Sequence, residues 1–121
     1  MSGKRSFRVI SAVAALWLLQ TAAAQQNSVT GSGAATYEYW CATCHSAGPN
    51  MPGTSALQAK YGGNPPAVLI ERADLTPEFI AAIVRTGISV MPPFRKTEIT
   101  DAELAALSEF IVATARNTSG N

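Results

Sequence analysis

Residues 41–45 read Cys41-Ala42-Thr43-Cys44-His45, and they hold both cysteines and the one histidine of the 121-residue chain. Side chains at positions i, i+3 and i+4 of a helical turn share one face, so this spacing brings the two thiols and the imidazole together. Two cysteines and one histidine are too few for a four-ligand structural zinc site. A thioredoxin-type redox pair needs a βαβ context, and no stretch of the sequence alternates as a strand would.

The spacing CxxCH is the pattern through which haem is attached covalently. Cys41 and Cys44 are expected to form thioethers with two vinyl groups on one haem edge, and His45 to bind the iron on the same face. A disulfide between Cys41 and Cys44 would close too small a loop to stabilise much. The alternative for His45 is an ordinary buried histidine, which its position directly after the cysteine pair disfavours.

The second axial ligand can be sought by elimination, because His45 is the only histidine. After the N-terminal segment the chain has two methionines, Met51 and Met91. Met51 follows the histidine closely and would have to cross the haem plane within a short loop. Met91 precedes Pro92 and Pro93, which fix two φ angles and stiffen the loop. Because histidine plus methionine is a known haem ligand set, we expect Met91 on the iron, and a core-filling methionine is the alternative.

The N-terminus has the order of a secretory signal peptide. Residues 1–8 are basic, residues 9–19 are an uncharged apolar run, and Ala22-Ala23-Ala24 offers a small-x-small cleavage site. We expect a signal peptide over residues 1–24, cleaved after Ala24, and a protein exported to the periplasm. An uncleaved anchor is the alternative, although an eleven-residue run is too short to span a bilayer as a helix. The mature form is expected to have no stable membrane span.

Charge argues against nucleic acid as a partner. The formal net charge of the chain is +1, but three of its nine basic residues lie in 1–24, where there is no acidic residue. Residues 25–121 therefore hold six basic and eight acidic residues. A slightly acidic chain offers no basic stripe for a phosphate backbone.

The rest of the chain reads as one all-α domain with long loops. The expected parts are a flexible leader over 25–32, a domain over 33–116 and a disordered tail over 117–121. The expected helices are 33–40, 67–72 with Asn64 as its N-cap, 77–86 and 101–116, and the expected loops are 46–63 and 88–96. Such long loops are uncommon in a compact domain unless something else organises them.

Two of these helices have clear start signals. Thr76 is a candidate N-cap with Pro77 in the first turn, and Gly87 lies where a left-handed C-cap is needed. Thr100 and Glu103 have the spacing of a capping box.

The order of elements from residue 33 to about residue 115 resembles that of class I c-type cytochromes of the monohaem, His/Met type. This order is helix, CxxCH, loop, helix, methionine loop and amphipathic helix. The resemblance implies a small fold of three to five helices wrapped around one covalent haem c, with no catalytic residue. In that family a glycine and an aromatic before the motif pack on an aromatic of the last helix. Gly33, Tyr37 and Phe110 match those positions.

The resemblance also implies contacts around the haem. A proline carbonyl after the motif commonly accepts Nδ1–H of the haem histidine, and Pro49 is the candidate, with Pro52 second. Haem propionates need donors or cations when they are buried. The candidates for these propionate contacts are Tyr61, Arg72 and Arg85.

The expected function is single-electron transfer between a dehydrogenase or other oxidoreductase and a respiratory acceptor. The expected partners are redox proteins: a dehydrogenase or flavoprotein as donor, and an oxidase or another cytochrome as acceptor. Two alternatives stay open, a haem enzyme or gas binder with an open sixth position, and the fixed cytochrome subunit of a flavin or quinone dehydrogenase complex. Residues 51–54, 75–79 and 90–104 are also similar to cytochrome subunits paired with flavoprotein oxidases of phenols or aromatic alcohols.

Overall fold

A computed structural model describes residues 32–120. The expected signal peptide and nearly all of the expected leader lie outside these residues. The described part is helical, as expected, and contains no strand beyond an isolated bridge between Ile88 and Met91. Its helical segments are 32–40, α2 (Ala42–His45), α3 (Pro52–Tyr61), the 3₁₀ turn η1 (Leu69–Glu71), α4 (Pro77–Thr86) and α5 (Asp101–Ser119).

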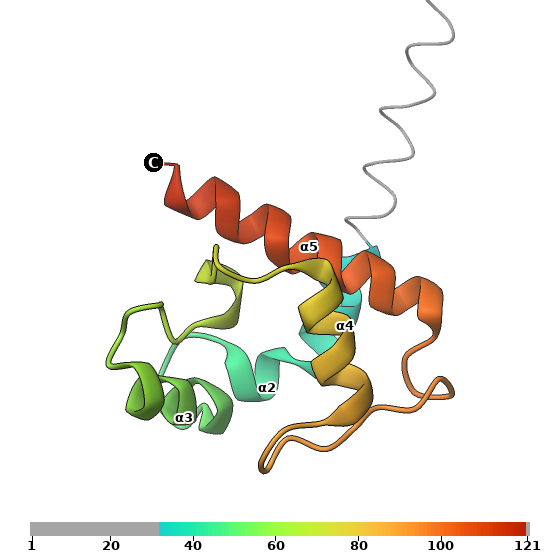
Figure 1. Ribbon diagram of the computed structural model, residues 1–121, viewed down its shortest axis with the longest axis horizontal. Helices are drawn as coiled ribbons and strands as arrows, with labels where there is room; N and C mark the ends of the chain where they lie inside the picture. Colours follow the sequence, from blue (N-terminus) through green and yellow to red (C-terminus); the bar gives the residue numbers. More distant parts are fainter. Residues whose placement is uncertain (1–31, 121) are drawn as a thin grey trace, which may run out of the picture.

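Helix α5 is the centre of the hydrophobic core. Leu107, Ile111 and Ala115 recur on one face of it and are at most 1 % exposed. This face packs against η1 and α4, while α2 packs against α3 on the other side of the molecule (Figure 1). Burial of an aliphatic side chain of this size contributes about 1.5–3 kcal/mol, so the stripe on α5 accounts for much of the packing energy.

The helix at 32–40 leads into the CxxCH motif and crosses α5 at close range. A Cβ on Gly33 would lie 2.7 Å from the carbonyl carbon of Ala106 and from Cβ of Phe110. One turn further along, the rings of Tyr37 and Phe110 are 5.7 Å apart between centroids. Both expected contacts are therefore present, and only glycine fits at the crossing point.

Both predicted helix starts are confirmed. The hydroxyl of Thr76 accepts a hydrogen bond from the backbone N–H of Phe79, and Pro77 begins α4. At α5, the Thr100 hydroxyl accepts from the Glu103 N–H at 3.2 Å, while the Glu103 carboxylate accepts from the Thr100 N–H at 2.8 Å. This reciprocal pair is a capping box, and its hydrogen bonds to Thr100 hold the pKa of Glu103 below its usual value.

Replacing Thr100 by alanine should lower the free energy of unfolding by about 1 kcal/mol, because the cap loses its side-chain acceptor. Thr97→Ala is the control, since Thr97 is an exposed residue of the preceding loop. Denaturant unfolding of the two variants checks the difference. Equal stabilities would show that the capping box contributes nothing.

The prediction of an irregular loop over 46–63 is wrong, because α3 occupies ten of these residues. Pro52 stands in its first turn and Gly62 ends it with φ 64° and ψ 19°, so the two residue types that suggested a loop are its two ends. None of its residues is buried, and its sequence carries no apolar stripe. The sequence of α3 therefore shows no hydrophobic periodicity that would predict a helix.

Two other expectations need correction. The helix expected over 67–72 is only the three-residue turn η1, and Asn64 does not cap it. The tail expected to be disordered from residue 117 continues α5 as far as Ser119. Hydroxyl groups in this last turn donate back to carbonyls one turn earlier, from Thr118 to Thr114 and from Ser119 to Ala115.

Candidate functional site

The CxxCH motif forms a single helical turn that continues the helix at 32–40. The Cys41 N–H donates to the carbonyl of Tyr37 at 2.8 Å. The Cys41 carbonyl in turn accepts from the N–H groups of Cys44 and His45, at 3.1 and 2.9 Å. The Tyr37 hydroxyl donates to the carbonyl of His45 at 3.3 Å. The turn is therefore held at both ends, with its three functional side chains at helical spacing.

The two thiols are free and partly buried. Burial, with a smaller contribution from Cys44, raises the pKa of the Cys41 thiol to about 11. An attacking thiol in a redox CxxC pair has a lowered pKa, so Cys41 lacks the character of such a nucleophile.

Burial also lowers the pKa of His45. The imidazole is therefore neutral at physiological pH, which is the form that binds a metal ion. Within residues 32–120 no three His, Cys, Asp or Glu side chains gather into a metal site. A neutral, buried imidazole of this kind can bind an iron that a cofactor brings with it.

The first turn of α3 lies directly against the histidine. A Cβ on Gly53 would be 2.6 Å from Cε1 and 2.8 Å from Nδ1 of His45. The Thr54 hydroxyl donates to the carbonyl of Ser46 at 2.8 Å and fixes this turn beside the motif. Gly53 is a site residue that sequence reasoning missed, because the stretch was read as an irregular loop.

The hydrogen bond expected from His45 to Pro49 is not formed. Nδ1 of His45 is buried and has no hydrogen-bond partner among the described residues, which excludes both Pro49 and Pro52 as acceptors here. Pro49 itself is exposed. The ring is positioned by packing against Gly53.

Met91 lies in a tight turn held by backbone hydrogen bonds. The N–H of Ile88 donates to the carbonyl of Met91 at 3.0 Å, and the N–H of Met91 donates to the carbonyl of Ile88 at 2.9 Å. Gly87 has φ 69° and ψ 169°, so its φ is positive as expected, but its conformation is not the left-handed cap. A Cβ there would lie 2.7 Å from the Met91 carbonyl oxygen.

The structure brings the methionine loop to the CxxCH motif. Trp40, which precedes Cys41, makes an edge-on contact with Phe94 at 5.5 Å between ring centroids. Cys41 and Met91 are both partly buried against the same hydrophobic cluster. The other methionine, Met51, is the N-cap of α3 and lies two residues before the glycine that packs on His45. Met51 therefore lies close to the residues that pack on His45, which favours Met91 over Met51 as the second iron ligand.

Of the three expected propionate contacts, Tyr61 and Arg72 lie together. The guanidinium carbon of Arg72 lies 4.8 Å from the centre of the Tyr61 ring. Lys60, more than Arg72, lowers the pKa of the Tyr61 hydroxyl. Arg72 is only 6 % exposed and donates two hydrogen bonds of 2.7 Å to Asp74. Its charge therefore already has a carboxylate partner.

The Arg85 side chain binds two other groups of the protein. Its two terminal nitrogens donate to the carbonyl of Phe94 at 3.1 Å and to the carboxylate of Asp101 at 2.9 Å. Both terminal nitrogens of Arg85 therefore have partners within the protein, and its expected propionate contact stays a prediction. These partners lie 9 and 16 residues away along the chain, too far for a local sequence pattern to reveal them.

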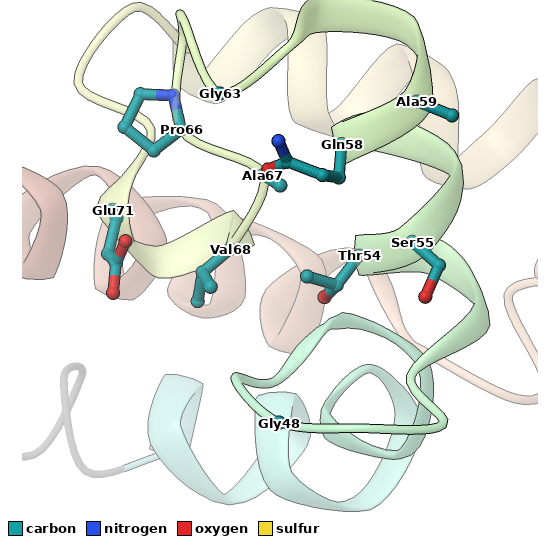
Figure 2. A pocket seen from close by; sticks show the side chains of 10 residues that line it. All are labelled: Gly48, Thr54, Ser55, Gln58, Ala59, Gly63, Pro66, Ala67, Val68 and Glu71. Carbon is teal, nitrogen blue, oxygen red and sulfur yellow. The ribbon is translucent and has the colours of Figure 1, made fainter.

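A surface cavity of about 720 Å³ lies between α3, the loop at Gly48 and the segment 63–71 (Figure 2). Its polar side chains are Thr54, Ser55, Gln58 and Glu71. The CxxCH residues and Met91 are not among the residues that line it.

Comparisons with known proteins agree with the candidate haem-binding residues, which are the two cysteines, His45 and the methionine loop. Residues 29–111 match the family described as cytochrome c oxidase, cbb3-type, subunit III. No curated protein and no solved structure matched the chain. No helix in the described residues is long and apolar enough to cross a membrane.

Two thiols, a neutral imidazole and a methionine loop fit a covalent haem, and the family implies one. The chain belongs to this cytochrome c family and is a haem-based electron-transfer protein.

Proposed function

We propose that this protein is an exported, periplasmic carrier that moves single electrons from a dehydrogenase or flavoprotein to an oxidase or another cytochrome. Membership of the cytochrome c family supports electron transfer. The N-terminal residues 1–24, with their basic, apolar and small-residue regions, support export. The observation that carries the proposal is the contact between Trp40 and Phe94, which places the methionine loop beside the CxxCH turn.

In this proposal Cys41 and Cys44 would hold the haem by thioethers, and His45 and Met91 would bind its iron. The bound haem would supply a metal centre that gains and loses one electron. His45 stays neutral because it is buried, and its ring is held in place by the first turn of α3. Methionine is a weaker donor than histidine and raises the reduction potential. The hydrogen-bonded turn at 88–91 restrains the backbone that carries the methionine.

The test is the absorption spectrum of the exported holoprotein and of Met91→Ala. The wild type should be six-coordinate and low-spin, with the weak far-red sulfur-to-iron band in the ferric form. Met91→Ala should lose that band and become high-spin, whereas Met51→Ala should keep it. A wild type that is already high-spin and binds small ligands readily would contradict the carrier and support the open-site haem enzyme or gas binder.

A second candidate is a fixed subunit of a larger redox complex, in place of a free carrier. The observation that favours it is the family description, which names an oxidase subunit. Mild extraction followed by size-exclusion chromatography distinguishes the two. A haem peak at the size of the single chain supports the free carrier, and co-elution with a large subunit supports the complex. The cofactor bound to that subunit, identified from its absorption spectrum after separation, would show whether it is an oxidase or a flavin or quinone dehydrogenase.

A further inference from the structure

The segment that carries Met91 is joined to the end of α4 by more than its own turn. The N–H of Phe94 donates to the carbonyl of Val84 at 2.8 Å. Arg85, the next residue of α4, returns a hydrogen bond to the carbonyl of Phe94 at 3.1 Å. Both backbone polar groups of Phe94 are thus bound by neighbouring residues of one helical turn. The loop is closed three residues after the methionine.

Arg85 also connects the end of the methionine loop, at Phe94, to the start of α5. Its second terminal nitrogen lies 2.9 Å from one carboxylate oxygen of Asp101. Lys96, in the loop between them, lies 2.7 Å from the other oxygen of the same carboxylate. The two cations lower the pKa of Asp101, which therefore stays ionised. Only 22 % of the Arg85 side chain is exposed, so this guanidinium is packed between the three segments.

We propose that Arg85 is a positioning residue for the axial methionine, which it keeps on the iron by fixing the loop through Phe94. The inference rests on the proposed function, in which Met91 is the ligand. A thioether is a weak ligand, so the fraction of molecules that hold it depends on how firmly the loop is closed. Asp101 serves the same end, because it fixes the orientation of the Arg85 guanidinium.

Arg85→Gln tests this proposal, with Arg95→Gln as its matched control. Arg95 lies on the same loop and its loss changes the charge equally, but its side chain is 83 % exposed and its ion-pair distance to Glu98 is 3.7 Å. The measurement is titration of the ferric holoprotein with imidazole, followed by loss of the far-red band. Because apparent affinity scales with the fraction of open molecules, Arg85→Gln should bind imidazole about tenfold more tightly than wild type. Arg95→Gln should titrate like wild type.

Two further variants separate positioning from general stability. Arg85→Lys keeps the charge but cannot reach both partners in fork geometry, so it should bind imidazole with intermediate affinity. Asp101→Asn should shift the titration in the same direction by a smaller factor, and it serves as the test if Arg85→Gln fails to fold. Thermal unfolding followed by circular dichroism reports any global loss of stability.

The outcomes distinguish the two hypotheses. A wild type without the far-red band would overturn the ligand assignment of Met91 and the inference with it. A wild type with the band, but with Arg85→Gln titrating like Arg95→Gln, would overturn only the role of Arg85. If Arg85→Gln does not fold, equal affinities for Asp101→Asn and wild type would overturn that role instead.

Discussion

Gly33→Ala is expected to destabilise the protein by about 3 kcal/mol, an overpacking effect at the crossing of two helices. The added methyl group would meet the carbonyl of Ala106, and backbone atoms of α5 cannot move aside as a flexible side chain can. The sign of the expected change in stability distinguishes this position from an exposed helix position. In an exposed helix the same substitution would stabilise by up to about 1 kcal/mol, because alanine is the better helix former.

The measurement is denaturant unfolding of the holoprotein, and Ala35→Gly is the control. Ala35 is exposed in the same helix and should lose about 1 kcal/mol through helix propensity alone. Gly33→Ala should also weaken the aromatic pair of Tyr37 and Phe110 one turn away. An unchanged or increased stability for Gly33→Ala would show that the helices do not approach as closely as described.

Gly53→Val is the second substitution with a large expected effect, and its effect is on the haem. The branched side chain would occupy the space of the His45 ring and of the Cys44 carbonyl oxygen, which lies 2.8 Å from a Cβ at this position. Groups that orient a metal-binding histidine typically contribute 10–100-fold to metal affinity, so we expect about a tenfold fall in six-coordinate holoprotein. The haem-to-protein absorbance ratio and the spin state of the purified variant measure this.

Ala56→Val is the control for the same substitution type in the same helix. Ala56 is exposed on α3, so valine there costs only a few tenths of a kcal/mol in helix propensity. Holoprotein yield and spectrum should match wild type. If Gly53→Val behaved in the same way, α3 would have no part in holding the histidine.

The helix starts and the CxxCH turn could be predicted because their signals are local. Thr76, Thr100 and Glu103 each act within one turn of the chain, and so do the two cysteines and the histidine. Helix α3 was missed because it buries no residue, so no apolar stripe marked it. The local pattern of proline and glycine then fitted a loop as well as it fitted a helix with two clear ends.

The contacts of the arginines could not be predicted from the sequence. Arg72 and Arg85 were chosen because a propionate would need a cation, yet both guanidinium groups bind carboxylates of this chain. Which carboxylate an arginine reaches is decided by tertiary packing, as with Asp101 at the start of α5. The same reasoning explains Gly53, whose importance depends on a side chain from another helix.

The approach of Gly33 to Ala106 has a consequence for the order of assembly. These residues lie near opposite ends of the described chain, so their contact closes a long loop and carries a large closure entropy. Because synthesis proceeds from the N-terminus, the CxxCH turn is made before α5. We therefore expect the two cysteines to be accessible to a haem while this loop is still open, and the helix at 32–40 to pack on α5 afterwards.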